Sequence, residues 1–505
     1  MFRKILVANR GEIAVRVLRT CRAMGIPTAA VYSEADRRAL HVRLADEALA
    51  IGSSAANESY LDIGRILEAA RSAGADAIHP GYGFLSENAA FAEACEKGGV
   101  KFIGPSAASM RLMGSKTGAR EAMIRSNVPV VPGSTGALES VEEALRAASV
   151  IGFPVMLKAA GGGGGKGMRL VLSAEELPSA FEQARNESLR AFASDELYIE
   201  KAIMAPRHVE VQILADEHGN VIHLGERECS LQRRHQKVIE ESPSPLVERR
   251  PEVREKLTAA AVRAAQAASY HNAGTVEFLM DASGAFYFLE MNTRLQVEHP
   301  VTELVTGLDL VREQILIAAG GKLPYRQQDI QFRGSAIECR IYAEDPDHNF
   351  FPSPGRITAL EQPQGPGVRV DSGAYAGWTV PVEYDPLIAK LAAWGQTRGE
   401  ALDRILGALR EYHVGGIKTT IPFFREIMAD GEFQRGEIDT GFIPRWFARR
   451  ESQKAKVFSS TEDEAVAVLV AGLQFLKLGG GAAKPSEGNG SVWKTIGKRS
   501  MLREA

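Results

Sequence analysis

The stretch Pro154-Val-Met-Leu-Lys-Ala-Ala-Gly-Gly-Gly-Gly-Gly-Lys-Gly-Met-Arg-Leu-Val-Leu172 predicts two strands joined by a glycine-rich loop. Five consecutive glycines at 161–165 disfavour a packed element, because glycine loses the most conformational entropy on ordering. Their bare backbone N–H groups suit an anion, and Lys158 and Lys166 add positive charge at the two ends. We therefore expect a mobile flap that closes over nucleotide phosphates; a solvated hairpin loop is the alternative.

The composition is that of an ordinary globular protein, with 45% hydrophobic and 24% charged residues. A chain of 505 residues is too long for one core and predicts about three domains. A net charge of −3 gives no electrostatic reason to expect nucleic acid or an acidic membrane as partner. The four cysteines are dispersed and form no CxxC, which favours a reducing cytosol over a disulfide scaffold or zinc site. With no signal-peptide pattern and no long apolar run, we expect a cytoplasmic protein.

The first part of the chain alternates short apolar strands with helices. Strands are expected at 4–8, 27–32, 48–51, 77–79 and 101–103, which is typical of a doubly wound parallel sheet. Asn9-Arg-Gly-Glu12 lies where a Rossmann fold carries its phosphate glycines, but G-x-G-x-x-G is missing, so no dinucleotide site is expected. A simple turn and a substrate contact both remain open. His79-Pro-Gly-Tyr-Gly-Phe-Leu-Ser-Glu-Asn88 predicts a rigid loop at the ligand-binding edge of the sheet.

The central part carries further strands and a run of positive charge. Residues 197–203 read as a strand whose free edge would hold an adenine ring through backbone groups. A half-buried strand with no ligand is the alternative. The run 226–237 contains five basic or imidazole side chains within eleven positions: Arg227, Arg233, Arg234, His235 and Lys237. It lies between apolar segments, which favours an anion site over a solvated face.

The stretch 275–292 predicts a β-hairpin with Ser283-Gly284 in the turn. This register places Glu277 opposite Glu290, Leu279 opposite Phe288 and Phe278 opposite Leu289. Two opposed carboxylates repel, and a cation between them removes the conflict. Asn292 lies two residues beyond Glu290 and supplies a third oxygen, so Mg²⁺ or Mn²⁺ is expected. Two exposed glutamates on an open face are the alternative, which Leu279, Phe286 and Phe288 on the same face disfavour.

The polar segment that follows, Asn292-Thr-Arg-Leu-Gln-Val-Glu-His-Pro300, supplies candidate catalytic groups. The fixed cation of Arg294 suits a developing oxyanion. The carboxylate of Glu298 suits a general base.

Together these motifs resemble biotin carboxylase, of the ATP-grasp superfamily, from residue 4 to about residue 449. The resemblance implies an α/β and α+β multidomain fold. Its parts would be a Rossmann-like N-terminal domain (1–115), an ATP-grasp domain (116–330) with a lid at about 132–203, a β-rich C-terminal domain (331–450) and a helical or linker tail (451–505). It also implies the reaction: ATP and bicarbonate give carboxyphosphate, and the carboxyl group passes to biotin carried on a protein.

The resemblance assigns roles to matching residues. ATP contacts are implied for Lys116, Lys158, Gly164, Gly165, Glu200, Lys201, Ile203, His208, Gln232, His235, Glu277 and Glu290. Ligands of Mg²⁺ (or Mn²⁺) are implied for Glu277, Glu290 and Asn292. Catalytic roles are implied for Lys237, Arg294 and Glu298, and bicarbonate or biotin contacts for Lys237, Arg294, Gln296, Val297 and Arg340.

The implied partners are a biotin carboxyl carrier protein, carboxyltransferase subunits and a second copy of the chain. No Ala-Met-Lys-Met biotin acceptor occurs, so the carrier is expected to be a separate chain. Arg16 and Arg19 fall where the resemblance places the dimer contact, and a solvated helix face is their alternative. The final acceptor stays open among acetyl-CoA, propionyl-CoA, another acyl-CoA and pyruvate. The rival functions are another ATP-grasp ligase and a catalytically silent scaffold.

Overall fold

The computed structural model describes residues 1–134, 136–159, 168–192, 195–457 and 469–470. The glycine run, with Gly164 and Gly165, and most of the predicted tail at 451–505 lie outside the described residues. Residues 1–443 form one compact unit and residues 444–505 a second. None of the described helices is long and apolar enough to cross a membrane.

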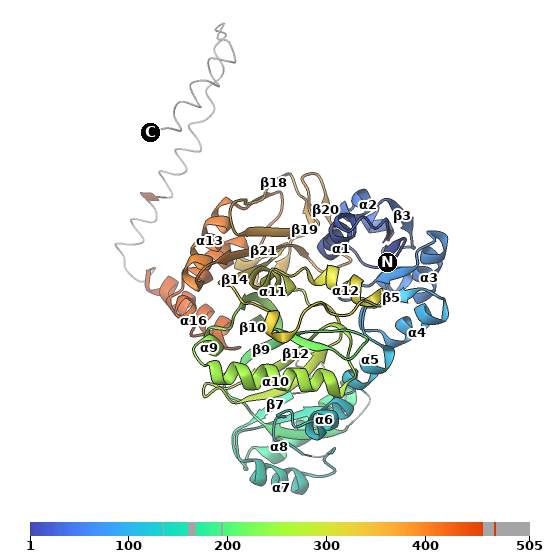
Figure 1. Ribbon diagram of the computed structural model, residues 1–505. Coiled ribbons are helices and arrows are strands. Elements are labelled where there is room, and N and C mark those ends of the chain that lie inside the picture. The colour runs from blue at the N-terminus through green and yellow to red at the C-terminus, as the bar shows by residue number, and fades with distance from the viewer. Residues whose placement is uncertain (135, 160–167, 193–194, 458–468, 471–505) are drawn as a thin grey trace. The chain divides into compact units, whose positions relative to one another are not determined.

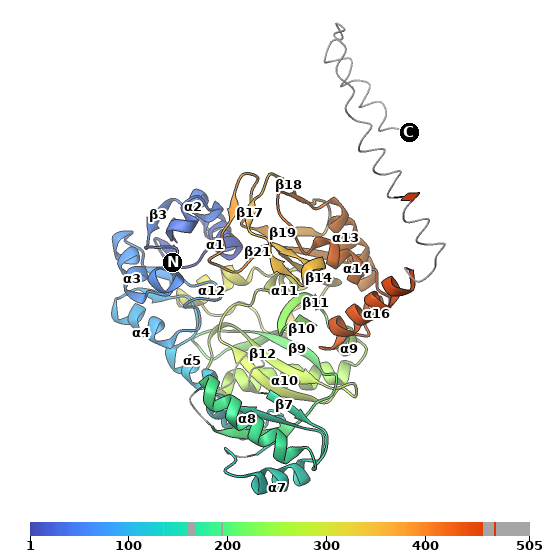
Figure 2. The same cartoon turned by 180° about the vertical axis from the view of Figure 1, so that it is seen from behind.

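A parallel five-stranded sheet forms the N-terminal part, drawn in blue in Figures 1 and 2. Its order is β3-β2-β1-β4-β5, and every neighbouring pair is parallel. The strands are β1 (Ile5–Val7), β2 (Thr28–Tyr32), β3 (Glu47–Ala50), β4 (Ala77–His79) and β5 (Lys101–Phe102). The helices are α1 (Gly11–Ala23), α2 (Leu40–Leu44), α3 (Ile63–Ser72), α4 (Ala89–Lys97) and α5 (Ala107–Gly114). The doubly wound domain predicted from the sequence is confirmed.

An antiparallel eight-stranded sheet joins the central and C-terminal parts, in the order β13-β12-β9-β10-β11-β14-β21-β19. Its strands are β9 (Arg207–Ala215), β10 (Val221–Arg233), β11 (Gln236–Ser242), β12 (Asn272–Met280), β13 (Phe286–Asn292), β14 (Ser335–Tyr342), β19 (Val368–Ser372) and β21 (Leu387–Gly395). Because β11 pairs with β14, the sheet runs without a break past residue 330, where we expected a domain boundary.

The two faces of this sheet differ in chemistry. On one face, Val209, Val211 and Phe278 pack with α10 (Pro251–Ala267) in a hydrophobic core. The alternating residues of β9 and β12 point to the other face, where α11 (His299–Thr306) contacts β10, β11, β14 and β21. The charged residues of the predicted site lie on this second face.

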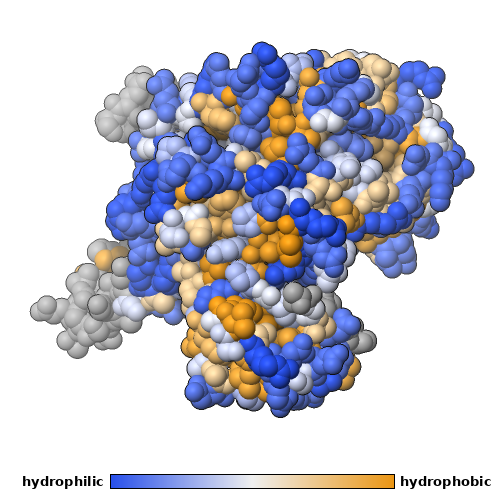
Figure 3. Space-filling view, turned by 60° about the horizontal axis from the view of Figure 1, so that its bottom comes forward, coloured by the Kyte–Doolittle hydropathy of each residue, from blue (hydrophilic) through white to orange (hydrophobic). Residues whose placement is uncertain are grey.

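A three-stranded sheet, in the order β7-β6-β8, forms the lid at the lower end of Figure 1. It consists of β6 (Val155–Ala159), β7 (Met168–Val171) and β8 (Leu197–Lys201), packed against α7 (Val141–Ile151) and α8 (Leu177–Phe192). On β7, Met168 and Leu170 are exposed while Val171 is buried. Figure 3, which turns this end forward, shows hydrophobic patches among the hydrophilic residues there.

The remaining elements are helices and short strand pairs. The helices are α6 (Lys116–Arg125), α9 (Pro245–Glu248), α12 (Leu310–Ala318), α13 (Arg398–Glu411), α14 (Ile421–Met428), α15 (Gly431–Gln434) and α16 (Phe442–Val457). Three short antiparallel pairs are β15 (Glu344–Asp345) with β16 (Phe351–Pro352), β17 (Gly355–Arg356) with β20 (Thr379–Val380), and β18 (Ala359–Glu361) with β22 (His413–Gly415). The predicted β-rich C-terminal part is confirmed.

The predicted hairpin register is correct at its functional end and wrong beyond it. Glu277 lies opposite Glu290, as predicted. A bulge follows at Leu289, and the later pairs are Phe278 with Phe288, Leu279 with Tyr287 and Met280 with Phe286. The bulge keeps Phe288 and Met291 in the core, so Glu290 does not share a face with Phe288 as we expected.

The predicted free edge of the 197–203 strand is also wrong. β8 pairs with β6 on one side and is bridged to Gly133 and Leu138 on the other. The backbone N–H of Lys201 donates to the Pro132 carbonyl at 2.7 Å, and that of Ala202 to the Pro154 carbonyl at 3.0 Å. Backbone N–H groups available to an adenine ring therefore begin beyond Ala202.

Candidate active site

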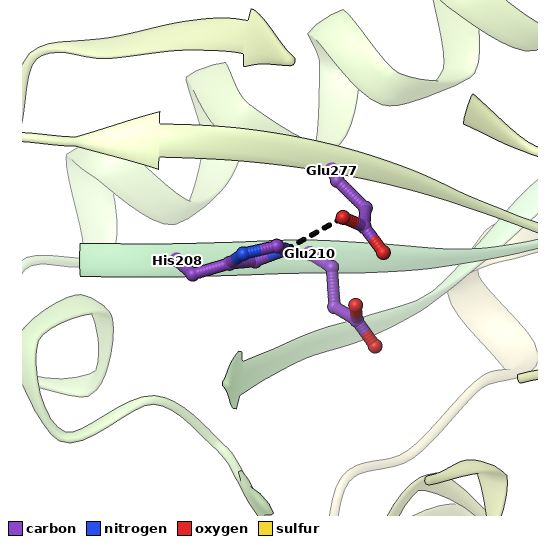
Figure 4. A group of neighbouring side chains, drawn as sticks. All are labelled: His208, Glu210 and Glu277. Atoms are coloured by element: carbon purple, nitrogen blue, oxygen red, sulfur yellow. Dashed lines mark ion pairs between the residues drawn. The ribbon is translucent and has the colours of Figure 1, made fainter. Parts of the chain in front are cut away.

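Four charged residues follow one another across four strands of the large sheet: Arg227 on β10, Glu210 on β9, Glu277 on β12 and Glu290 on β13. We call them the acid row. Neighbouring strands are only about 4.8 Å apart, so its three carboxylates are close neighbours. Figure 4 shows Glu210 and Glu277 side by side with His208. Such a row repels itself unless cations separate its members.

Lys237, on β11, supplies a cation at the centre of the row. Its Nζ lies 2.5 Å from Glu210 Oε2, 2.6 Å from Glu277 Oε1 and 2.8 Å from Glu298 Oε1. Burial lowers the pKa of Lys237, but the three glutamates outweigh it and raise that pKa well above its usual value. Arg227 closes the other end through Glu210, with Nε to Oε1 at 2.5 Å.

Glu277 is the most heavily contacted carboxylate of the row. Besides Lys237, its Oε1 accepts hydrogen bonds from Asn292 Nδ2 at 2.7 Å and Gln296 Nε2 at 2.9 Å. Its Oε2 lies 2.8 Å from His208 Nε2. Burial raises the pKa of Glu277, but Lys237 and His208 outweigh it and hold that pKa below the usual value. Glu277 is therefore ionised at neutral pH.

Glu290 differs, because it has no hydrogen bond or ion pair within the described residues. Its side chain keeps solvent access, yet the surrounding protein desolvates the carboxyl, and repulsion from Glu277 adds to this, so its pKa is raised. Two opposed carboxylates, one unpartnered, fit a hard divalent cation. Asn292 Oδ1 accepts from Arg294 Nη2 at 3.0 Å, so its amide must turn to become a ligand.

His208, Glu210 and Glu277 also approach one another closely enough to hold a metal ion (Figure 4). The hydrogen bonding argues against that reading. His208 Nδ1 lies 2.9 Å from Gln232 Nε2, an amide donor, so Nδ1 is the acceptor and Nε2 carries the proton. A protonated Nε2 cannot coordinate a metal, and Lys237 already contacts both glutamates, with Arg227 as a second cation on Glu210. The contact between His208 and Gln232 also brings together two predicted ATP-binding residues.

Glu298, the predicted base, is fully buried between two cations. Lys237 contacts its Oε1, and Arg340 Nη2 donates to its Oε2 at 2.9 Å. Burial raises the pKa of Glu298, but Lys237 and Arg340 outweigh it and hold the pKa well below the usual value. A general base works best with a pKa near the working pH, so the substrate must first draw these cations away.

Arg294, the predicted catalytic cation, is held by the side chains of three residues. Its Nε donates to Glu87 Oε2 at 2.9 Å, its Nη1 to Gln296 Oε1 at 2.7 Å and its Nη2 to Asn292 Oδ1. Glu87 belongs to the loop 79–88, so the structure places that loop at the site. Val297, three positions further along the chain, accepts a hydrogen bond from Lys390 Nζ through its carbonyl oxygen at 2.8 Å.

The other predicted nucleotide contacts are spread over the lid, α6 and a hairpin tip. Lys158 Nζ pairs with Glu200 Oε2 at 2.5 Å. The side chain of Lys201 instead donates to the carbonyls of Gly152 and Phe153, both at 2.9 Å, beyond the end of α7. Lys116 is an exposed residue at the start of α6, and Ile203 follows β8.

The basic run 226–237 does not form the single anion site we predicted. It folds into β10 and β11, joined by Arg234 and His235, both with positive φ. Its cations therefore lie in different places. Arg227 and Lys237 contact the glutamates of the acid row. Arg233 pairs with Glu344 at 2.6 Å, and Arg234 Nη2 donates to Asn349 Oδ1 at 3.2 Å. His235 is exposed at the turn, which suits a contact with a mobile ligand.

Arg16 is not a solvated residue of α1, which excludes the alternative given for it. It is buried, and its Nη2 lies 2.8 Å from both Glu303 Oε1 and Asp309 Oδ1. Arg19 is exposed, and the dimer contact expected for both residues stays a prediction.

Several site residues were missed in the sequence: Glu87, Glu210 and Glu240, the last paired with Arg340 Nε at 2.6 Å. Glu210 had a usable signal, because it lies two residues from His208 on the same strand face. The loop that carries Glu87 was predicted at the ligand-binding edge, but its contact with Arg294 had no signal, since the two residues are 207 positions apart.

Several known proteins and family profiles are similar to this chain. Three family profiles match the chain: "Biotin carboxylase, N-terminal domain" over residues 1–110, "Carbamoyl-phosphate synthase L chain, ATP binding domain" over 115–326, and "Biotin carboxylase C-terminal domain" over 338–445. A biotin carboxylase of Nostoc sp. is 56% identical over 88% of this chain and 98% of its own length. A pyruvate carboxylase subunit of Methanothermobacter thermautotrophicus is 53% identical over 92% of this chain and 94% of its own length.

One similar solved structure contains ligands. It is the biotin carboxylase domain dimer of Hydrogenobacter thermophilus 2-oxoglutarate carboxylase, in complex with MgADP, ADP and bicarbonate. It is 50% identical to this chain, with a TM-score of 0.81, and the match covers 88% of this chain and 98% of that one.

Proposed function

The chain belongs to the biotin carboxylase family, and we propose that Lys237, Arg294 and Glu298 carry its reaction beside a cation held at Glu277 and Glu290. The reaction is the ATP-dependent carboxylation of biotin by bicarbonate. The observation that carries the residue assignment is the contact of one ammonium, Lys237 Nζ, with Glu277 at 2.6 Å and Glu298 at 2.8 Å. It joins the predicted cation site directly to the predicted base.

Bicarbonate activation follows from these contacts. A bicarbonate anion next to Lys237 and Arg340 competes with Glu298 for both cations. As they turn to the substrate, the pKa of Glu298 rises toward that of an ordinary buried carboxyl. Glu298 then takes the bicarbonate proton, and a carbonate oxygen attacks the γ-phosphorus of ATP as ADP leaves. The product of this step is carboxyphosphate.

The nucleotide lies, in this proposal, between the lid and the acid row. Lys116, Lys158, Glu200, Lys201, Ile203, His208, Gln232 and His235 contact it, together with Gly164 and Gly165, which lie outside the described residues. A divalent cation at Glu277, Glu290 and Asn292 would neutralise phosphate charge, which is the main need of phosphoryl transfer. The unpartnered Glu290 supports this position.

Biotin carboxylation uses the same cluster of charges. The bond between the carboxyl carbon and the phosphate oxygen of carboxyphosphate breaks, phosphate leaves with the ureido N–H proton, and the ureido nitrogen bonds to the carboxyl carbon. Arg294, held in place by Glu87 and Gln296, stabilises the negative ureido oxygen of deprotonated biotin. Arg340 and the 296–297 segment hold bicarbonate or biotin nearby. Carboxyphosphate hydrolyses readily, so the lid serves to exclude water during the transfer.

The proposed partners are a separate biotin carboxyl carrier protein, carboxyltransferase subunits and a second copy of the chain. The dimeric solved relative supports the last of these.

A cytoplasmic location is supported by the four cysteines, all buried and none in a disulfide. The domain limits 1–115, 116–330 and 331–450 stay a prediction. Acceptor choice belongs to the transferase, so identifying what co-purifies with the chain would name the acceptor.

The residue assignment is tested with Glu298→Gln, using Glu361→Gln as control because Glu361 is exposed on β18. Bicarbonate-dependent ADP formation should fall by about 10²-fold or more in Glu298→Gln, as expected for loss of a general base. The control should keep wild-type activity. Equal rates in both variants would overturn the role of Glu298.

A further inference from the structure

Lys390, in the middle of β21, is a buried lysine that the proposed mechanism does not use. Only 1% of its side chain is exposed. Its shortest contact is the 2.8 Å hydrogen bond from Nζ to the carbonyl oxygen of Val297. Val297 lies between Gln296, which contacts Arg294, and Glu298, the predicted base. Lys390 therefore touches the backbone of the segment to which we assign bicarbonate.

Three other parts of the chain meet at the same ammonium. Glu12 Oε1 of α1 lies 3.4 Å from Lys390 Nζ, and Asp371 Oδ2 of β19 lies 3.9 Å from it. The ring of Tyr82, in the loop after β4, is centred 5.8 Å away. The N-terminal motif Asn9-Arg-Gly-Glu12, which the sequence left open as a turn or a substrate contact, thus reaches the site indirectly.

The acidic neighbours are weaker partners for Lys390 than the carbonyl is. Asp371 is already held by Arg369, with hydrogen bonds of 3.1 Å and 2.7 Å. Neither carboxylate oxygen of Glu12 makes a well-formed hydrogen bond in the described part of the chain. Burial raises the pKa of Glu12 to about 7, although Lys390 opposes this. A structural ion pair would be expected to close more tightly than the 3.4 Å that separates Glu12 from Lys390.

We propose that Lys390 is a positioning residue for bicarbonate activation, which fixes the Val297 carbonyl and with it the orientation of Gln296 and Glu298. The role rests on the proposed function of that segment. A charged donor on a buried carbonyl prevents the peptide from rotating, and α11 begins immediately after Glu298, so the segment is held at both ends. Lys390 also links the N-terminal part of the chain, through Glu12, and the C-terminal strands to the Val297 carbonyl.

The test compares kinetic constants for bicarbonate and for ATP. Lys390→Met combined with Glu12→Gln removes both charges, so no unpaired buried ion is left between them. We expect the KM for bicarbonate to rise by about tenfold, as loss of a charge-assisted hydrogen bond implies, while the KM for ATP stays within about twofold. Lys390→Arg keeps the charge but displaces the donor, and should raise the bicarbonate KM by about threefold.

Arg398→Met combined with Glu241→Gln is the matched control. It removes a 2.6 Å ion pair between α13 and β11 whose contacts do not include the site. The control should leave both KM values unchanged. A wild-type bicarbonate KM in folded Lys390→Met/Glu12→Gln would overturn the proposal, as would an equal rise in the control. If the double variant does not fold, an unchanged KM in Lys390→Arg overturns it. A wild-type chain without bicarbonate-dependent ATP cleavage would instead refute the proposed function.

Discussion

Two rows of charged side chains cross the same eight-stranded sheet, and they are completed in different ways. The acid row runs over β10, β9, β12 and β13 as Arg227, Glu210, Glu277 and Glu290. A second row runs over β14, β21 and β19 as Arg340, Lys390 and Asp371, and we call it the paired row. Both rows contact the segment 297–298. Lys237 links the acid row to Glu298, whereas Arg340 and Lys390 of the paired row contact Glu298 and Val297, respectively.

The paired row is completed within the chain. Arg340 is bound by Glu240 and Glu298, and Asp371 by Arg369, so each buried charge has its opposite nearby. The acid row is not completed in this way. Lys237 and Arg227 pair with Glu210 and Glu277, but Glu290 has no partner in the part of the chain that the structure describes. The contrast teaches that charges matched within the chain need no ligand to hold them, whereas an unmatched carboxylate in such a row marks a ligand site.

The sharpest way to break this comparison is Glu290→Gln. We expect bicarbonate-dependent ADP release with Mg²⁺ to fall by about 10²-fold or more, because a cation ligand is lost. The free energy of unfolding should stay the same or rise, since repulsion with Glu277 disappears. Exposed Glu361→Gln is the control. Retained ADP release would refute the metal assignment.

Arg294→Ala tests the chemistry next to the acid row. Biotin carboxylation should fall by roughly 10²-fold, as the loss of one charge-stabilising donor usually causes. The assay uses free biotin, so that docking of a carrier protein does not contribute. Near-normal turnover would show that another cation stabilises deprotonated biotin.

Removing a partner of the paired row should lower stability and leave activity largely unchanged. Arg369→Met leaves Asp371 and Glu303 without the partner that lies 2.7 Å from each. We expect the free energy of unfolding to fall by about 3 kcal/mol, the typical cost of breaking a buried pair. Urea titration measures this loss, and kcat of the folded fraction should stay within about threefold of wild type. A variant of normal stability with no activity would erase the distinction between the rows.

The comparison also shows what could be read from the sequence. Alternation and the turn placed Glu277 opposite Glu290 correctly, because both signals are local. The bulge at Leu289 was missed, since it depends on Phe288 and Met291 reaching the same core. The paired row was missed as well. Arg340 and Asp371 are 31 positions apart, and only the sheet brings them to either side of Lys390.

Likewise, the buried ion pairs of Arg16 were missed, since the sequence left open only a dimer contact and a solvated helix face. Its partners Glu303 and Asp309 follow it by 287 and 293 residues. Local pattern thus predicted the elements and the cation site, whereas burial of charge by distant partners required the fold.

A smaller effect is expected at Glu240, where Arg340 joins the paired row to Glu298. Burial raises the pKa of Glu240 from 4.5 to about 7, although Arg340 opposes this. The native state therefore binds the Glu240 proton more tightly than the unfolded state does. The contribution of this group to stability is present below pH 4.5, is lost as pH rises toward 7, and is constant above that.

Glu240→Gln should remove this dependence. The stability of the wild type relative to the variant should decrease between pH 4.5 and about 7, by at most about 1.4 kcal/mol per pH unit. Urea unfolding across that range measures the difference. A stability difference that increases with pH would mean that the ion pair with Arg340 outweighs burial and that Glu240 is ionised across this pH range.

The account depends most on the claim that the unmatched end of the acid row holds a divalent cation. Titration of Mn²⁺ in the presence of ADP, followed by electron paramagnetic resonance of free Mn²⁺, tests this in wild type, Glu290→Gln and Arg369→Met. We predict that Glu290→Gln weakens binding by about tenfold or more, while folded Arg369→Met binds as wild type does. Equal Mn²⁺ affinity in wild type and Glu290→Gln would contradict the claim.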